Sequence, residues 1–155
     1  MKRLKKESQI MKEYKENGIS FEMIEPLKKW NVYLKDFDKD TKLYSELKKY
    51  NIKQVKMEIT IKKNYPFMPP FVRIVEPRFS GYKGFITTGG SLCVDVLTIN
   101  GWVPTYTLIS LMNQLKIFIN AGEIDIVKYN IPYTLKEAEH HYNHTTKLHK
   151  WDKAV

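Results

Sequence analysis

Cys93 is the one cysteine in this chain of 155 residues, and it lies in the stretch TTGGSLCVDVLTINGW, residues 87–102. A thiolate is the strongest ordinary side-chain nucleophile near neutral pH, so this position has the chemistry for covalent catalysis. Gly89 and Gly90 precede it and permit close backbone approach. Small donors stand beside them at Thr87, Thr88 and Ser91. Free cysteine is also among the most buried residue types, so this stretch alone leaves a reactive thiol and a core residue as equal alternatives.

The histidines offer a second kind of chemistry. His149 follows Ala138 and Tyr142 on one stripe of a predicted C-terminal helix, so we expect it to face inward, as a packing residue or as a base. His140 and His144 are four residues apart and could share a metal ion, but no further ligand is evident. We therefore predict no metal site, and no cofactor.

The net charge of +9 raises the question of nucleic-acid binding. Most of the positive charge is lysine, scattered along the chain, whereas arginine, the usual reader of bases and phosphates, is scarce. The chain has no zinc-finger spacing and no aromatic RNA-binding signature. We therefore expect no nucleic-acid partner. A steep salt dependence of binding would mark that alternative.

The length favours one domain, residues 1–155. One cysteine cannot form an internal disulfide, and no apolar run approaches the ~20 residues that span a bilayer. The N-terminal residues are charged and lack the apolar core of a signal peptide. We expect a soluble monomer in the cytoplasm or nucleus, without a membrane partner.

Hydrophobic periodicity predicts the elements that must position these side chains. Residues 2–16 predict an amphipathic helix that stops at the Asn-Gly pair 17–18. Strands are predicted at 20–24 and 30–37, and the polar segment 41–51 has room for a short helix.

The clearest strand is 53–61, where apolar and polar residues alternate. Three prolines exclude a central strand in the segment 66–70, so we expect a rigid bend in that segment. A strand is predicted directly after the bend, at 71–75. The three prolines are Pro66, Pro69 and Pro70.

A helix is predicted over 107–119, with Thr105 or Thr107 as its cap. We expect its apolar stripe to lie in the core. The stripe consists of Leu108, Leu111, Met112, Leu115, Phe118 and Ile119. A last helix is predicted over 134–151, because Thr134 and Glu137 have the spacing of a capping box.

Strands grouped before helices indicate an α+β fold. In this arrangement an N-terminal helix precedes a four-stranded antiparallel meander sheet. The irregular segment 87–102 comes next, and helices complete the chain.

Three motifs resemble one enzyme family. Residues 65–72 read Tyr-Pro-Phe-Met-Pro-Pro-Phe-Val, and residues 90–97 read Gly-Ser-Leu-Cys-Val-Asp-Val-Leu. Trp102 and Pro104 follow, and then the predicted helix. In this order and spacing the motifs resemble those of ubiquitin-conjugating enzymes, and the likeness spans nearly the whole chain. It is most similar to the Q-type branch, whose usual N-terminal extension this sequence lacks. The segments that resemble this branch are 69–75, 88–93, 97–102 and 133–138.

The resemblance implies the ubiquitin-conjugating (UBC) fold and a transferase with a thioester intermediate. Cys93 would accept ubiquitin or a ubiquitin-like protein from an activating enzyme, in an ATP-dependent pathway. It would then pass the modifier to a lysine or hydroxyl of a protein substrate, or to a ubiquitin ligase. The rival interpretations are a UBC-fold binding module that scaffolds without activity, and a cysteine hydrolase in which His149 is the base.

One family motif is absent. Most members have His-Pro-Asn about ten residues before the cysteine, and residues 83–85 here read Lys-Gly-Phe. The resemblance gives that asparagine the role of oxyanion donor, and losing one such donor typically costs ~10²–10³ in rate. We expect a substitute among the backbone N–H groups of 89–91 and the hydroxyls of Thr87 and Thr88. A tyrosine that Q-type enzymes have eight residues before the cysteine is Phe85 here.

A carboxylate near the thiol would help an attacking amine to lose its proton. Asp95 is the closest in sequence. The resemblance places Asp125, with Glu123, in a loop where the family often has an acidic gate. It also matches His149 to a histidine in the last helix of Q-type enzymes, which gives His149 a role as base. The alternative for the carboxylates is ordinary surface solvation.

The resemblance also assigns a docking surface. Its basic part, which meets the activating enzyme and overlaps the ligase site, consists of Arg3, Lys5 and Lys6. The two loops that dock ligases carry Phe67, Val103 and Pro104. The alternative for the basic part is a solvated face of an amphipathic helix.

Overall fold

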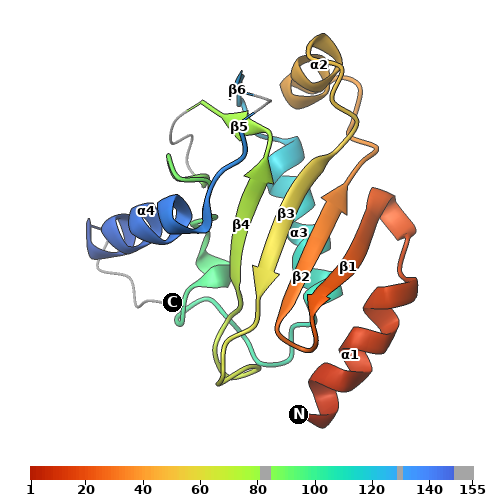
Figure 1. Ribbon diagram of the computed structural model, residues 1–155, viewed down its shortest axis with the longest axis vertical. Helices are drawn as coiled ribbons and strands as arrows, with labels where there is room; N and C mark the ends of the chain where they lie inside the picture. The colour runs from red at the N-terminus through yellow and green to blue at the C-terminus, as the bar shows by residue number, and fades with distance from the viewer. Residues whose placement is uncertain (81–84, 129–130, 149–155) are drawn as a thin grey trace.

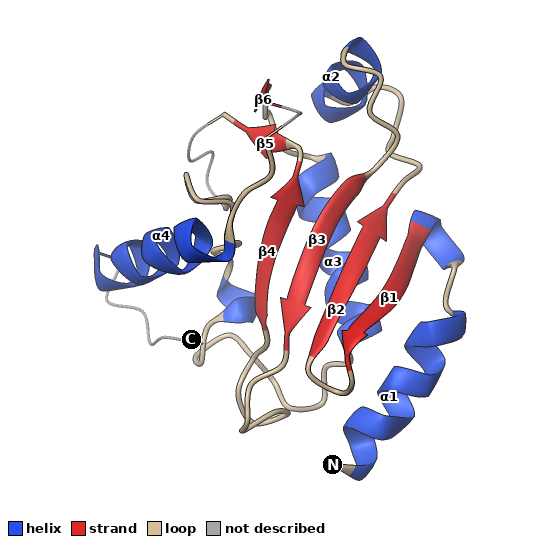
Figure 2. Ribbon diagram, viewed as in Figure 1, coloured by secondary structure: helices blue, strands red, loops and turns tan. Residues whose placement is uncertain are grey.

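The computed structural model describes residues 1–80, 85–128 and 131–148. Within these residues a four-stranded antiparallel sheet has the order β1-β2-β3-β4, so strands that follow each other in the chain are neighbours (Figure 2). Its strands are β1 (Ile19–Glu25), β2 (Lys29–Leu34), β3 (Val55–Thr60) and β4 (Phe71–Glu76). The predicted meander and the α+β class are confirmed.

Alternation explains why one face of this sheet is the core. In β3 the side chains of Val55, Met57 and Ile59 are buried, and the polar residues between them point to the other face. Helix α3 (Leu108–Asn120) runs across the buried face (Figure 1). The side chains that it contributes to the core are Leu108, Leu111, Met112, Leu115 and Ile119.

The other long helices lie at the two edges of the sheet, beside its outer strands. Figure 1 shows α1 (Lys2–Glu13) beside β1, and α4 (Leu135–Leu148) beyond β4. A small separate cluster of buried residues joins α4 to β4, in which the rings of Phe71 and Tyr142 meet edge to face at 5.5 Å between centroids. The predicted capping box of α4 is confirmed, because Thr134 and Glu137 exchange backbone-to-side-chain hydrogen bonds.

Shorter elements complete the described chain. Helix α2 (Lys42–Lys49) lies between β2 and β3, and a second, two-stranded sheet pairs β5 (Arg78–Phe79) with β6 (Ile126–Lys128). Single 3-10 turns are η1 (Glu16–Gly18) and η2 (Asp95–Leu97). Strands of two and three residues carry no readable alternation, which is why β5 and β6 were not predicted.

Three predicted elements were too long, and one of them, the strand predicted at 53–61, is observed as Val55–Thr60. The first helix ends at Glu13 rather than 16, because Tyr14 is extended and its ring packs on Phe21 at 5.9 Å between centroids. The second strand ends at Leu34 rather than 37, because Asp36 has a φ of 56° that no strand accommodates. Thr107, one of two predicted caps, caps α3. The end of the predicted helix 134–151 lies outside the described residues.

Candidate active site

Cys93 ends a short hairpin at the edge of the sheet. Its N–H donates to the carbonyl of Phe85 at 2.8 Å, and the N–H of Thr87 donates to the carbonyl of Ser91 at 2.9 Å. The same hairpin pairs with β4 through two further backbone hydrogen bonds, of 2.7 and 3.0 Å. This segment, which we call the Cys93 hairpin (residues 85–93), therefore fixes the cysteine relative to the sheet.

The side chain of Cys93 is buried at the wall of a groove. It is 3 % exposed, and the groove has a volume of about 570 Å³. The other residues of the wall are Phe85, Val94, Asp95, Val96, Gln114 and Phe118. Burial raises the pKa of the Cys93 thiol to about 11, because removal from water disfavours the thiolate. The resting thiol is therefore protonated at neutral pH, and reaction requires a base or a bound partner that favours the thiolate.

Phe118 corrects one part of the predicted core stripe. It is 40 % exposed, and its ring lies 6.4 Å from that of Phe85 between centroids. Successive residues of a helix differ by about 100° in direction, so when Ile119 faces the sheet, Phe118 turns toward the Cys93 hairpin. The spacing of Phe118 also fits the core stripe, so its sequence position gave no sign that it lines the site.

Gly89 and Gly90 make their close approach to the C-terminal part of the chain. A Cβ atom at Gly89 would lie 2.3 Å from the carbonyl oxygen of Glu137, and one at Gly90 would lie 2.7 Å from the ring of Tyr133. Gly90 also has a φ of +90°, which L side chains rarely adopt. The glycines thus let the turn of the Cys93 hairpin pack against Tyr133 and α4, and this packing supports the strand that leads to Cys93.

The hydroxyls proposed as oxyanion donors lie along the hairpin. Thr87 Oγ1 and Ser91 Oγ are 2.6 Å apart, and both residues are buried, so the Thr87 hydroxyl has a partner inside the hairpin. The N–H of Gly90 donates to the carbonyl of Thr87 at 2.9 Å. Thr88 is exposed in the turn, at the opposite end of the hairpin from the Phe85–Cys93 pair. The register of the hairpin therefore separates the Thr88 hydroxyl from the thiol.

The candidate carboxylates have different surroundings. Asp95 is exposed, begins η2 and lines the same groove as Cys93. Asp125 lies between α3 and β6, where its carboxylate pairs with the ammonium of Lys42 at 2.8 Å. The structure thus brings Asp95 to the groove and places Asp125 beside α2. His149 lies outside the described residues.

Arg3 has partners within the molecule. Its Nε donates to Glu7 at 2.7 Å, and its other nitrogens donate to the carbonyls of Pro104 and Tyr106. The guanidinium therefore fastens α1 to the loop before α3. Lys5 and Lys6, its predicted companions on the basic face, are exposed.

The proposed docking loops present apolar side chains on a fixed support. Phe67 is 77 % exposed and Val103 is 43 % exposed. The indole N–H of Trp102 donates to the carbonyl of Pro66 at 2.7 Å, which joins the two loops. Exposed apolar side chains that are held together in this way are typical of an interaction surface.

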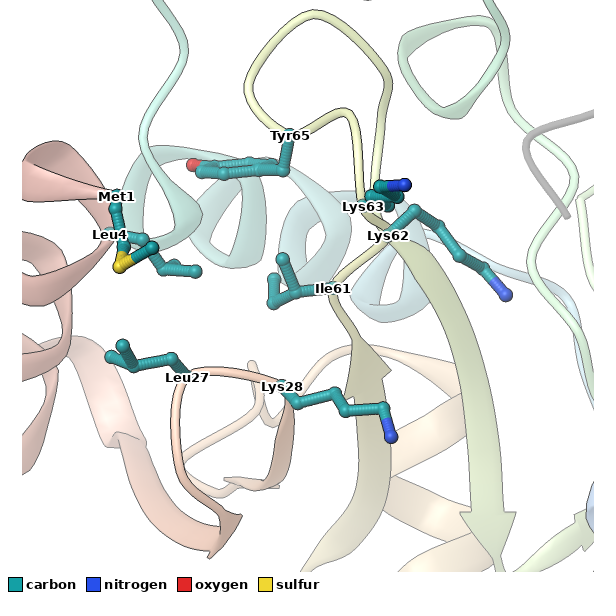
Figure 3. Close-up of a pocket in the computed structure, with 8 residues that line it drawn as sticks. All are labelled: Met1, Leu4, Leu27, Lys28, Ile61, Lys62, Lys63 and Tyr65. Atoms are coloured by element: carbon teal, nitrogen blue, oxygen red, sulfur yellow. The ribbon is translucent and has the colours of Figure 1, made fainter.

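A second groove, of about 510 Å³, lies between the start of α1, the β1–β2 turn and the segment after β3. In Figure 3 the apolar side chains of Met1, Leu4, Leu27 and Ile61 face a common space below Tyr65, and three lysines lie on one side of it. This groove is lined by residues other than those of the Cys93 groove.

Across residues 1–80, 85–128 and 131–148 there is no group of three or more His, Cys, Asp or Glu side chains suited to a metal ion.

Comparison with known protein families identifies the family to which the chain is related. The family model described as "Ubiquitin-conjugating enzyme" matches residues 3–150. The chain is 33 % identical over 150 residues to the Q-like protein 1 among the ubiquitin-conjugating enzymes of Homo sapiens, covering 94 % of this chain and 92 % of that protein. It is 31 % identical over 127 residues to the ubiquitin-conjugating enzyme E2 Q1 of Mus musculus, covering 78 % of this chain and 30 % of that protein. No helix in the described part of the chain has the length and apolar character needed to cross a membrane.

Solved structures agree in fold. The human ubiquitin-conjugating enzyme E2 G1 superposes with a TM-score of 0.60 at 19 % identity, over 74 % of this chain and 89 % of that one. A ubiquitin-conjugating enzyme E2 from Plasmodium falciparum superposes with a TM-score of 0.58 at 19 % identity, over 79 % and 98 %. At this identity the likeness establishes the UBC fold, while the family model and the relatives establish descent. The chain therefore belongs to the ubiquitin-conjugating enzyme family, in its Q-type branch.

Proposed function

We propose that residues 1–155 form one catalytic domain in which Cys93 carries ubiquitin, or a ubiquitin-like protein, as a thioester. The observation that supports this most directly is the position of the cysteine. It stands on a hairpin that is bonded to the sheet on one side, and it opens on a groove on the other. Burial alone is common for a cysteine, so the groove beside Cys93 is the feature that supports a catalytic role.

The first step is a thioester exchange. The Cys93 thiolate attacks the carbonyl carbon of the modifier's C-terminal thioester on an activating enzyme. The new carbon–sulfur bond forms as the old one breaks, and the activating enzyme's cysteine leaves with the electron pair and takes up a proton. Because the pKa of the Cys93 thiol is raised by burial, we expect the docked activating enzyme to expose the thiol or to accept its proton.

The second step transfers the modifier to an acceptor. A lysine amine, or a hydroxyl, attacks the Cys93 thioester, a new bond to carbon forms, and the Cys93 sulfur leaves. The acceptor amine must lose a proton, since an ordinary lysine has a pKa of ~10.4. Asp95 is our first candidate to assist, because it lines the groove. Asp125 and His149 remain candidates for the base. Thr88 remains a candidate for the oxyanion donor only if the hairpin turn moves toward the thiol when a partner docks, because its hydroxyl lies at the opposite end of the hairpin. When a ligase takes the modifier on its own cysteine, a second exchange replaces this step.

The partners follow from the same proposal. Lys5, Lys6, Phe67, Val103 and the segment around Pro104 would receive the activating enzyme and ligases, one after the other. Arg3 would act there through the loop that it holds. We place these encounters in the cytoplasm or nucleus.

The test is a charging assay with activating enzyme, ubiquitin and ATP, resolved on a non-reducing gel. The wild-type chain should gain a heavier band that disappears with reductant or without ATP, and Cys93→Ala should not. In a second stage the charged protein is mixed with free lysine. Asp95→Asn should then slow discharge by about tenfold or more, as expected for a lost acid–base group, while charging is unchanged. Thr88→Val, Asp125→Asn and His149→Ala test the other three candidates, and full discharge by any of these variants removes that side chain from the mechanism.

The burial of Cys93 favours one second candidate, a UBC-fold module that binds ubiquitin or scaffolds ligases without catalysis. Such a module would bind partners through the docking loops and form no thioester. A wild-type chain that fails to charge, yet binds ubiquitin or a ligase in solution, would move this alternative to the front.

A further inference from the structure

The hydrogen-bond donors of the Cys93 hairpin are largely committed to bonds within the fold. The backbone N–H groups of Thr87, Leu92 and Cys93 donate to carbonyls at 2.9, 3.0 and 2.8 Å. The Thr87 hydroxyl is bonded to Ser91, and the turn at 88–90 lies at the far end of the hairpin from the thiol. When an amine attacks a thioester, negative charge develops on the carbonyl oxygen, and a donor beside that oxygen lowers the barrier. A side-chain donor for this oxygen therefore has to come from another element of the groove.

Helix α3 brings one such donor to the groove. Of the described residues that form the wall, Gln114 alone has a side-chain N–H group, because the others are apolar apart from the Asp95 carboxylate and the Cys93 thiol. The side chain of Gln114 is exposed, and no described residue is its hydrogen-bond partner. Its carboxamide is therefore free to turn toward a group that is bound in the groove.

The register of α3 agrees with this placement. The core stripe of the helix faces the sheet, whereas Phe118 turns toward the Cys93 hairpin, with its ring 6.4 Å from that of Phe85 between centroids. Gln114 precedes Phe118 by four residues, so the two side chains lie on one face of the helix, about 5–6 Å apart at their Cβ atoms. Phe85 in turn accepts the N–H of Cys93. The carboxamide thus lies on the face of α3 that is turned to the thiol.

We propose that Gln114 is the oxyanion donor for transfer from Cys93, which rests on the proposed function. As the amine nitrogen bonds to the thioester carbon, an electron pair of the C=O bond moves to the oxygen, and the Nε2–H of Gln114 donates to that oxygen. When the C=O bond re-forms, the carbon–sulfur bond breaks, Cys93 leaves as the thiolate, and the proton of the nitrogen passes to a base or to water. A carboxamide cannot serve as that base, so its contribution is separable from proton removal.

The experiment measures single-turnover discharge of the ubiquitin-charged full chain to hydroxylamine. This amine is largely uncharged near neutral pH, so its attack does not wait for a base, and the rate reports stabilisation of the oxyanion. Gln114→Met keeps the length of the side chain and removes the N–H group. It should slow discharge by about tenfold or more, short of the ~10²–10³ of a buried donor because Gln114 is exposed in the resting protein. Gln9→Met makes the same change at an exposed position of α1, and this control should discharge as wild type.

A second variant separates donation from other roles of the carboxamide. Gln114→Glu has no N–H group, and its carboxylate repels the oxyanion, so it should discharge more slowly than Gln114→Met. If the amide oxygen instead held the modifier as an acceptor, Gln114→Glu would keep that oxygen and the order of the two rates would be reversed. The urea midpoint of Gln114→Met should match that of wild type, because its side chain has no described partner to lose.

Three outcomes would overturn the assignment. The first is equal discharge by Gln114→Met and wild type, and the second is faster discharge by Gln114→Glu than by Gln114→Met. The third is a slow Gln114→Met that also unfolds at lower urea, which would show that the side chain supports the fold. Failure of the wild-type chain to charge would instead contradict the proposed function itself.

Discussion

At the residue scale, Cys93 carries a sulfur atom that is reactive as a thiolate, in a buried environment that disfavours the thiolate. The thiol lines a groove, yet it is almost fully buried, and burial raises its pKa from the ordinary 9.0 to about 11. Only a thiolate attacks a thioester at a useful rate. The resting protein therefore holds this thiol, the proposed nucleophile, in its protonated form, and a partner that opens the groove or supplies a base would increase its reactivity.

The raised pKa of the Cys93 thiol predicts that it is alkylated slowly. At pH 7 iodoacetamide should modify Cys93 in the folded chain about 100-fold more slowly than in the same chain unfolded in urea, because two pKa units lower the thiolate fraction by that factor. Between pH 7 and 10 the rate in the folded chain should keep rising without a plateau. Mass spectrometry of timed samples measures both rates. Equal rates in the folded and unfolded chain would contradict the described burial.

At the scale of elements, one buried carboxylate joins three parts of the proposed docking surface. Glu7 on α1 accepts from the Tyr65 hydroxyl and from the N–H of Leu108, both at 2.8 Å, besides its bond with Arg3. Leu108 is the first residue of α3, where a negative charge also interacts favourably with the helix dipole. Burial and the Glu7 bond both raise the pKa of Tyr65, so its hydroxyl stays a donor. Glu7 thus helps to position both docking loops, together with the bonds of Arg3 and Trp102.

We expect Glu7→Ala to destabilise the fold by about 2–4 kcal/mol, because it leaves a hydroxyl, an N–H and a guanidinium without their shared acceptor. Glu7→Gln keeps one acceptor oxygen and should cost about half as much. Urea unfolding measures the change. Glu13→Ala, at an exposed position of the same helix, is the control and should stay within about 0.5 kcal/mol of wild type. A loss for Glu7→Ala as small as that of the control would show that the three bonds are not made in solution.

At the scale of the whole molecule, the last described helix is tied to the edge of the fold by an arginine fork. Arg78 of β5 donates to both carboxylate oxygens of Glu137, at 2.8 and 3.1 Å, and its guanidinium stacks on the Tyr133 ring at 4.4 Å. Gly89 in turn packs on the backbone of Glu137. The contact that anchors α4 therefore also supports the turn of the Cys93 hairpin, and the two should respond to acid together.

The pKa of Glu137 is lowered to about 2, chiefly by the hydrogen bond from Arg78. Since an unfolded glutamate has a pKa near 4.5, the pair stabilises the fold above that pH, and its contribution is lost as the pH falls toward 2. We expect Glu137→Gln to lower the free energy of unfolding by about 1 kcal/mol at pH 7, after allowance for solvent screening, and by nothing at pH 2. Denaturant unfolding at several pH values measures the difference. Lys136→Gln, a neighbour outside the pair, should keep the wild-type acid profile; a constant offset for Glu137→Gln between pH 7 and 2 would refute the linkage.

Local patterns in the sequence determined most of the elements and the family to which the chain belongs. Alternation predicted the core face of β3, because successive side chains of a strand point to opposite sides. Two threonines, Thr105 and Thr107, and the Thr134–Glu137 pair predicted helix starts, because a cap acts within four residues of itself; Thr107 is the cap that α3 uses. The motifs around Cys93 gave the family, which the relatives confirm. All of these signals lie within one element or one short stretch of chain.

Only the tertiary structure decided which of the candidate side chains have internal partners. Arg3 was expected to face a binding partner, but it bonds to carbonyls about a hundred positions away in the chain. Asp125 was expected beside the thiol, and it pairs with Lys42 across 83 positions. Phe118 was expected in the core stripe of its helix, but its side chain is partly exposed and lines the groove. Periodicity and capping are set by neighbours in sequence, whereas these outcomes depend on which distant segments the packed sheet and helices bring together, and no local pattern carries that information.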